Sequence, residues 1–247
     1  MSPGPSLPPG RVVELPGRGS TWVREIAGPP GAHTLLLLHG WTANADLNWF
    51  SSFGSLGEHF RVVALDLRGH GRGVRSRRPF RMRDAVDDAA ALLDSSERER
   101  RAFAAMGAVS LASRVTPDAA RRAMAGWVLD RRQSGPATDW VAEEMHRNDW
   151  TAVLAAGAAL GRFDSRAWLG EVDVPAAVVL TRFDNVVSPR RQEAMAKAIP
   201  RCVIYEVDGD HGVVAMNPQA FVPILVRAVQ DVARREEAAG RPAASRS

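Results

Sequence analysis

Residues 34–40 read TLLLLHG, a continuous apolar run that ends at a histidine and a glycine. An apolar run without alternation is typical of a strand that helices cover on both faces. Residues 61–65, RVVAL, form a second such run, which leads into Asp66 and the glycine-rich loop RGHGRG at residues 68–73. Two buried strands, each followed by polar residues and glycine, predict an α/β protein with a largely parallel sheet flanked by helices.

Patterns on either side of these strands extend the prediction. Apolar runs and turn residues predict an opening hairpin, two later strands, a helix between them and a final helix. The ranges are 11–15 and 21–26 for the hairpin, 176–181 and 202–207 for the later strands, Ser188-Pro189 to Pro200 for the helix between them, and 218–235 for the final helix. This alternation of strand and helix agrees with a parallel arrangement.

Residues 82–93 have the spacing of an amphipathic helix that packs on a sheet. The apolar positions Val86, Ala89, Ala90 and Leu93 are predicted to face the core. Three aspartates of the same segment are predicted to lie on the opposite side of the helix: Asp84, Asp87 and Asp88.

Composition excludes several classes of protein. The chain has 247 residues, 45% of them apolar and 24% charged, which is ordinary for a globular protein. Its longest leucine run is far short of the roughly 20 apolar residues that a membrane span requires. The segment MSPGPSLPPGR at residues 1–11 lacks the pattern of a secretory signal, so a cytoplasmic protein is expected. One cysteine, Cys202, excludes an internal disulfide and a cysteine zinc cluster.

The positive charge of the chain does not predict a nucleic-acid partner. The formal net charge is +4, and 31 of the 32 basic residues are arginine. Such a bias beside abundant Ala, Gly and Pro is typical of a GC-rich coding sequence, which explains the basicity without a partner.

Polar side chains follow each predicted strand. Since ligands of open α/β sheets bind at the carboxyl ends of the strands, these residues are the candidates for chemistry. They are His39, Gly40 and Trp41, then Asp66, then Arg182 and Asp184, and finally Asp208, Asp210 and His211. Asp184 and His211 follow two successive strands, so they can meet above the sheet, where the carboxylate would orient the imidazole as a base.

Four motifs in this order resemble those of the α/β-hydrolase family. They are LLLLHGWTA at 35–43, VVALDLRGHGRG at 62–73, VVLTRFDNVVSP at 178–189 and DGDHGVV at 208–214. The resemblance covers most of residues 11–235. It implies an α/β-hydrolase fold in which residues 97–169 occupy the position of the helical cap.

The resemblance also implies roles for individual residues. Asp184 would be the catalytic acid and His211 the general base. The turn at His39-Gly40 would aim the backbone N–H of Trp41 at an oxyanion. The implied substrate is a small apolar or acyl-ester-like molecule, and no cofactor or metal is implied.

One motif of the family is missing. The nucleophile of the family lies on a strained turn, usually Gly-x-Ser-x-Gly, between the glycine-rich loop and the acid. No serine in this interval has glycine two residues away on both sides. The remaining candidates are Ser95, Ser96 and Ser110, and the nucleophile stays unassigned.

The central strands of the family also have no counterpart here. After the helix at 82–93 the sequence passes directly into the charged segment 97–101, where the family would continue with a strand, the nucleophile turn and a helix. We therefore expect the strands at 34–38 and 176–181 to become direct neighbours, with the cap helices as their connection.

These features give a domain plan. Residues 1–10 form a disordered segment and 11–96 the first part of the core; 97–169 form the helical cap, 170–235 the second part of the core, and 236–247 a disordered tail.

Three readings of function remain open from the sequence. The first is an esterase-type hydrolase in which Asp184 and His211 activate an unidentified nucleophile or water. The second is a non-catalytic relative that binds an apolar molecule, which the missing nucleophile turn favours. The third is an internally truncated product with impaired folding.

Two residues are expected to be structural: Cys202 as a small core residue, and His70 in a loop hydrogen bond.

Overall fold

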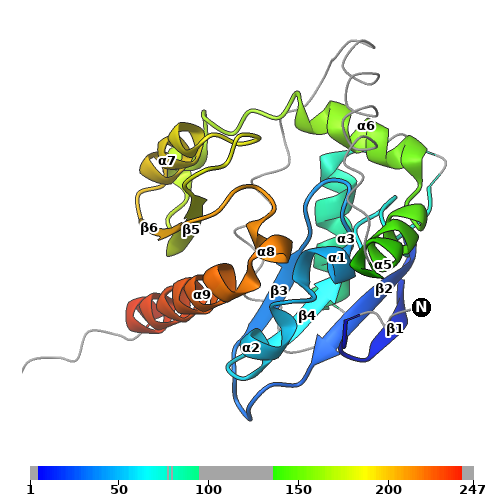
Figure 1. The fold of residues 1–247 in the computed structure, drawn as a ribbon, viewed down its shortest axis with the longest axis horizontal. Coiled ribbons are helices and arrows are strands. Elements are labelled where there is room, and N and C mark those ends of the chain that lie inside the picture. Colours follow the sequence, from blue (N-terminus) through cyan, green and yellow to red (C-terminus); the bar gives the residue numbers. More distant parts are fainter. Residues whose placement is uncertain (1–4, 77, 79, 95–135, 241–247) are drawn as a thin grey trace, which may run out of the picture. The chain divides into compact units, whose positions relative to one another are not determined.

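The computed structural model describes residues 5–76, 78, 80–94 and 136–240 (Figure 1). The chain divides into two compact units: residues 1–53 with 60–164, and residues 54–59 with 165–247. Residues 97–135 of the expected cap lie outside the described residues, and so do the candidate serines Ser95, Ser96 and Ser110.

The first unit contains a four-stranded sheet in the order β1-β2-β4-β3 (Figure 1). Strand β1 (Gly10–Leu15) pairs antiparallel with β2 (Gly19–Ile26), so the predicted hairpin is confirmed. Strand β4 (Arg61–Leu65) lies between β2 and β3 (Thr34–Leu38), antiparallel to the first and parallel to the second. The sheet is therefore mixed, because the hairpin reverses the chain direction beside the parallel pair.

Helices connect and follow the strands of this sheet. Between β3 and β4 come α1 (Ala45–Trp49) and α2 (Phe53–Gly57), and after β4 comes α3 (Met82–Asp94). Two helices of the expected cap follow, α5 (Pro136–His146) and α6 (Trp150–Leu160). The core of the unit gathers buried side chains from β1, β2, β4, α3 and the loop before it: Val13, Leu15, Val23, Val63, Leu65, Val74, Ala89 and Leu92.

The burial of two elements differs from the prediction. In α3 the buried positions include Ala85, Asp88 and Ala89, so the expectation that Asp88 faces solvent is wrong. Asp88 is buried because Arg18 and Arg68 both donate hydrogen bonds to its carboxylate, each at 2.6 Å. In β3 the burial is incomplete, since Leu38 is 38% exposed.

The second unit contains a two-stranded sheet. Strand β5 (Ala176–Thr181) pairs parallel with β6 (Cys202–Val207), and α7 (Pro189–Ala198) connects them, as predicted. A short 3-10 helix, Leu169–Glu171, precedes β5; α8 (Val213–Met216) and α9 (Pro218–Gly240) follow β6.

The expected pairing of the strands at 34–38 and 176–181 is wrong. In the described part of the chain these strands belong to different sheets, and each pairs with the next strand in the sequence, which follows after α1 and α2 in the first case and after α7 in the second. Short connections favour such pairs of sequential strands. At the end of the chain, α9 continues to Gly240, so residues 236–240 are helical and not part of a disordered tail.

No helix within the described ranges is both long enough and apolar enough to span a membrane.

Candidate active site

Asp184 and His211 meet at the carboxyl ends of β5 and β6. The parallel register places Thr181 beside Val207, so the loops after the two strands start side by side. Backbone hydrogen bonds from Arg182 and Phe183 to the end of β6 and the loop after it hold the two loops together. The ring nitrogen Nδ1 of His211 lies 3.0 Å from Oδ2 of Asp184. The geometry predicted for this pair is therefore present in the second unit.

The structure keeps Asp184 ionised. Burial acts to raise the pKa of this carboxyl group, whose side chain is 4% exposed. Hydrogen bonds outweigh burial and lower the pKa: they come from the Val187 N–H, the His211 ring, the Val186 N–H and the Thr181 hydroxyl. A carboxylate that faces Nδ1 favours the tautomer in which Nδ1 carries the proton.

His211 presents its other nitrogen for chemistry. Its side chain is 54% exposed, in contrast to the buried carboxylate that holds it. Because Nδ1 is hydrogen-bonded to Asp184, Nε2 is the ring nitrogen that can take a proton from a nucleophile. Asp184 and His211 can therefore act as an orienting acid and a general base.

Two further residues of this site were not predicted from the sequence. Thr181, at the end of β5, donates a hydrogen bond from its hydroxyl to Asp184 Oδ2 at 3.0 Å. Gln192, on α7, lies 2.8 Å from the same hydroxyl and 3.5 Å from Oδ2. Thr181 lies within the motif at 178–189, but it was read there only as the last residue of a strand. Gln192 lies outside the four motifs, and a buried glutamine on a helix gives no signal in the sequence.

The predicted oxyanion loop follows β3 in the first unit. His39 is buried, and its ring bridges two backbone groups: Nδ1 lies 2.9 Å from the carbonyl oxygen of Gly40, and Nε2 accepts from the Leu67 N–H at 2.9 Å. Because Nε2 accepts, the proton is on Nδ1 and is donated to Gly40. His39 therefore fixes the peptide that joins Gly40 to Trp41.

The same loop offers one backbone donor. The N–H of Gly40 donates to Asn48 Oδ1 at 2.8 Å. Among the described residues nothing accepts from the N–H of Trp41, so this N–H is available as a donor, and its role toward an oxyanion stays a prediction. The Trp41 indole donates to the carbonyl of Val153 on α6 at 2.7 Å, which anchors the loop to a helix of the expected cap.

The residue after Trp41 has an uncommon backbone conformation. Thr42 has a φ of 67°, in a region that β-branched residues rarely occupy. The amide of Asn148, just after α5, donates to the Thr42 carbonyl at 3.0 Å, and its oxygen accepts from Gly71 at 2.6 Å. Asn148 thus joins the loop after β3 to the glycine-rich loop after β4.

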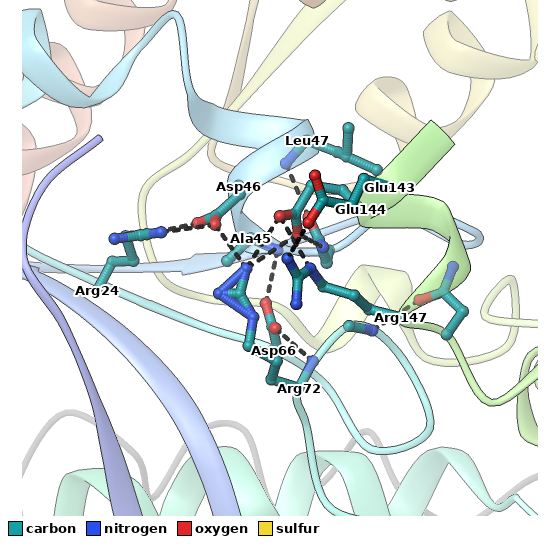
Figure 2. A network of polar contacts seen from close by, with 12 residues as sticks. Arg24, Ala45, Asp46, Leu47, Asp66, Arg72, Glu143, Glu144 and Arg147 are labelled. Carbon is teal, nitrogen blue, oxygen red and sulfur yellow. Dashed lines mark hydrogen bonds and ion pairs between the residues drawn. The ribbon is translucent and has the colours of Figure 1, made fainter. Parts of the chain in front are cut away.

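A buried ionic network lies next to these loops (Figure 2). Arg24 donates two hydrogen bonds to Asp46, at 2.6 and 2.7 Å, in bidentate geometry. Arg72 donates to Asp46 at 3.0 Å and to Glu144 at 2.9 Å. Glu144 also pairs with Arg147, three residues further along the chain. The network therefore connects β2, α1 and the glycine-rich loop to helix α5.

Asp66 joins the start of α1 to the glycine-rich loop. Its two oxygens accept from the N–H groups of Ala45, at 2.9 Å, and Arg72, at 2.7 Å. Burial raises the pKa of Asp66 to about 6, and these hydrogen bonds only partly oppose the shift. Because the pKa of Asp66 is higher in the folded than in the unfolded state, its protonated form contributes fully to stability below the pKa of the unfolded state. This contribution is lost as the pH rises through the pKa of the folded state.

His70 lies in the glycine-rich loop and is structural, as predicted. Its Nδ1 contacts the carbonyl oxygen of Arg68 at 3.1 Å. Burial, together with the charge of Arg75, lowers the pKa of its ring, although the hydrogen bond to Arg68 opposes the shift. In the second unit, Cys202 is half-buried, and burial raises the pKa of its thiol, so it is a poor nucleophile.

The pH dependence of stability tests the state of His39. Burial lowers its pKa to about 3. Between pH 6.5 and 3 the unfolded chain binds a proton that the folded chain does not, so the free energy of unfolding falls as the pH falls, by about 1.4 kcal/mol per pH unit. A glutamine side chain at this position can donate to Gly40 and accept from Leu67 without titrating. We expect His39→Gln to remove this slope in urea unfolding measured from pH 6.5 to 4.

The exposed His146 on α5 supplies the control for this measurement. We expect His146→Gln to follow the pH dependence of the parent protein. Parallel curves for the parent and His39→Gln would show that His39 does not hold a lowered pKa.

Comparison with known proteins assigns the family. The profile of the alpha/beta hydrolase family matches residues 35–224, which include both the predicted oxyanion loop and the Asp184–His211 pair. The chain belongs to the alpha/beta hydrolase family. The resemblance inferred from the four motifs is therefore confirmed.

Two curated proteins match this α/β-hydrolase over short segments. The chain is 32% identical over 71 residues to proline iminopeptidase PfmaB of Pestalotiopsis fici, and 32% identical over 62 residues to methylesterase 17 of Arabidopsis thaliana. The first segment covers 28% of this chain and 25% of the iminopeptidase, and the second covers 25% of this chain and 22% of the methylesterase. The chain thus spans about a quarter of the length of the curated relatives it matches.

Solved structures confirm the α/β-hydrolase fold over most of the chain. A hydrolase from Pseudomonas aeruginosa superposes with a TM-score of 0.72 at 20% identity, over 89% of this chain and 98% of that structure. An esterase from Exiguobacterium antarcticum gives a TM-score of 0.71 at 15% identity, over 90% of this chain and all of that structure. At these identities the similarity establishes the fold and not the substrate.

Proposed function

We propose that this α/β-hydrolase cleaves a carboxylic-ester-type bond in a small apolar or acyl-bearing molecule. The observation that carries the proposal is the contact of His211 Nδ1 with a buried, ionised Asp184, which leaves Nε2 on an exposed ring. His211 acts as the general base, Asp184 orients it, and the Trp41 N–H stabilises the oxyanion. The names of two similar proteins, a methylesterase and an esterase, agree with this bond class.

The nucleophile in this proposal is either a serine or a water molecule that His211 activates. Ser95, Ser96 and Ser110 are the serines that the sequence offers, and all three lie outside the described residues. The alternatives from the sequence, a non-catalytic binding protein and a truncated product, become outcomes of the test below.

The proposal also includes the domain plan. Residues 97–169 act as the cap, and α5 and α6 are its described helices. The indole of Trp41 reaches α6, and Arg72 reaches Glu144 on α5, so cap and oxyanion loop are held together within the first unit. No cofactor takes part in the proposed reaction, and a cytoplasmic location is proposed with it.

A fluorophosphonate tests for an activated serine. The reagent phosphonylates a serine hydroxyl whose proton a neighbouring base removes. We expect intact-mass analysis of cooperatively melting protein to show a single adduct, and the His211→Ala variant to lose it. Peptide mapping then names the serine. The exposed His146 supplies the matched control, because His146→Ala should be labelled like the parent protein.

Each other outcome has a distinct meaning. An adduct that persists in His211→Ala removes this histidine from the mechanism. If folded protein forms no adduct but hydrolyses an ester in a His211-dependent way, the nucleophile is water. If it forms no adduct and has no esterase activity, the hydrolase proposal is wrong, and stabilisation by apolar ligands would favour a binding protein. A non-cooperative melt would favour the truncated product.

A further inference from the structure

The amide of Gln192 is held in one orientation by the groups around it. This side chain is buried, and its Oε1 accepts from the backbone N–H of Thr181 at 3.1 Å. Its Nε2 donates to the carbonyl of Val187 at 2.7 Å and contacts the Thr181 hydroxyl at 2.8 Å. A backbone N–H can only donate and a carbonyl can only accept, so the two ends of the amide cannot exchange.

This orientation fixes the proton of the Thr181 hydroxyl. An amide nitrogen only donates, so the hydroxyl oxygen must accept from Gln192. The single hydroxyl proton then points to the other neighbour, Asp184 Oδ2, at 3.0 Å. A carboxylate can only accept, which agrees with this direction. The hydrogen bonds therefore run one way, from Gln192 through Thr181 to Asp184.

The carboxylate oxygen that accepts the hydrogen bond from Thr181 is the one that contacts His211. Oδ2 of Asp184 contacts both the Thr181 hydroxyl and His211 Nδ1, each at 3.0 Å. Oδ1 accepts from the N–H groups of Val186, at 2.8 Å, and Val187, at 2.9 Å. Because the Val187 carbonyl binds Gln192, a closed ring of hydrogen bonds surrounds the carboxylate and prevents its rotation.

We propose that Gln192 is a positioning residue, which directs the Thr181 hydroxyl proton to Asp184 Oδ2 and so holds that oxygen against His211 Nδ1. This inference rests on the proposed function, in which the pair serves as acid and base. Gln192 acts only through Thr181 and Asp184, so substituting it should change the state of the pair and not merely the stability of α7.

The first test removes the hydroxyl from Thr181. Thr181→Val keeps the shape of the side chain, and Thr181→Ser keeps the hydroxyl. NMR of selectively labelled full-length protein follows the titration of the Asp184 carboxyl carbon and the downfield signal of the His211 Nδ1 proton. We expect Thr181→Val to raise the pKa of Asp184 and to weaken the His211 signal, because the charged carboxylate loses a donor. We expect Thr181→Ser to restore both.

The second test changes Gln192. Gln192→Met removes its polar atoms and frees the Thr181 hydroxyl to rotate. We expect the pKa of Asp184 to rise, and the rise in the double variant with Thr181→Val to be smaller than the sum of the two single rises, because the two residues act mainly through one chain of hydrogen bonds. Gln192→Glu keeps the acceptor for the Thr181 N–H but competes for the hydroxyl proton, so it should raise the pKa further. If Gln192→Met does not fold, the pKa of Asp184 is measured in Gln192→Glu instead.

Labelling by the fluorophosphonate gives an independent readout. A hydrogen bond to a charged group corresponds to roughly tenfold in rate, so we expect Gln192→Met to label about ten times more slowly. Glu193 is the neighbouring residue on α7 and pairs with Lys197 at the surface, so Glu193→Gln should label like the parent protein.

The NMR results separate this inference from the proposed function. An unchanged Asp184 pKa and His211 signal in both Gln192 variants would overturn the inference, even if the protein is labelled normally. Additive effects in the double variant would also overturn it. If the parent protein neither reacts with the fluorophosphonate nor cleaves an ester, the proposed function fails while the NMR titrations still decide whether Gln192 positions Asp184.

Discussion

Asp184→Asn is expected to lower the rate of the proposed ester hydrolysis by about 10⁴-fold, the cost that such a substitution has in a serine protease. The reason lies in the contacts of the carboxylate. The N–H groups of Val186 and Val187 both donate to Oδ1, so the amide oxygen of the new side chain must remain at that position. Its NH₂ group then takes the place of Oδ2 and faces His211.

This exchange reverses the hydrogen bond to His211. An NH₂ group donates to Nδ1, which places the ring proton on Nε2 and removes the base from the side that faces the nucleophile. The rate should be measured with a short-chain ester, and the tautomer by nitrogen NMR of labelled histidine. The exposed Asp208 pairs with Arg182 in the same pair of loops, so Asp208→Asn serves as the control and should leave the rate within about twofold of the parent. A nitrogen spectrum unchanged by Asp184→Asn would contradict the argument.

The sequence predicted the strands well because their signal is local. The apolar runs at 34–38, 61–65, 176–181 and 202–207 all became strands with these bounds. A short apolar run between turn residues has few alternatives to a strand in an α/β protein. Asp184 and His211 could be predicted for a related reason, because residues that follow parallel strands share one edge of the sheet.

The missed features depend on partners that are distant in the sequence. Asp88 is spaced like a solvent-facing residue of its helix, and only the arrival of Arg18 from the hairpin turn and Arg68 from the glycine-rich loop allows its burial. Asp46 and Glu144 lie almost one hundred residues apart, yet Arg72 contacts both. No periodicity within one segment indicates such contacts, because they arise only when the segments pack.

The sheet topology was missed for a different reason. The expected pairing of 34–38 with 176–181 assumed that the family's sheet closes over the central strands that the sequence was expected to lack. The two strands lie in separate sheets of the described chain, and the backbone of each is hydrogen-bonded along one edge to the next strand in the sequence. Hydrogen bonds within each strand–helix–strand segment form without the cost of a long loop closure, so these local pairs are favoured over a distant one.

The network of Figure 2 predicts the largest effect on stability. Asp46 is 1% exposed and is the shared partner of Arg24 and Arg72. Asp46→Ala leaves the guanidinium of Arg24, whose side chain is 13% exposed, without its bidentate partner. Breaking a buried ion pair from one side costs about 3–5 kcal/mol, so we expect the free energy of unfolding to fall by this amount in urea at pH 7.

Two comparisons show whether the cost comes from the uncompensated charge. The pair Glu193–Lys197 is exposed, so Glu193→Ala should cost less than about 0.5 kcal/mol. Arg24→Met combined with Asp46→Leu replaces the bidentate pair by apolar side chains. Since an apolar replacement removes the need to bury an unpaired charge, the double variant should be more stable than Asp46→Ala. The opposite result, a double variant less stable than Asp46→Ala, would show that the ion pair is a net source of stability. Helix α5, which Glu144 attaches through Arg72, would then depend on this pair.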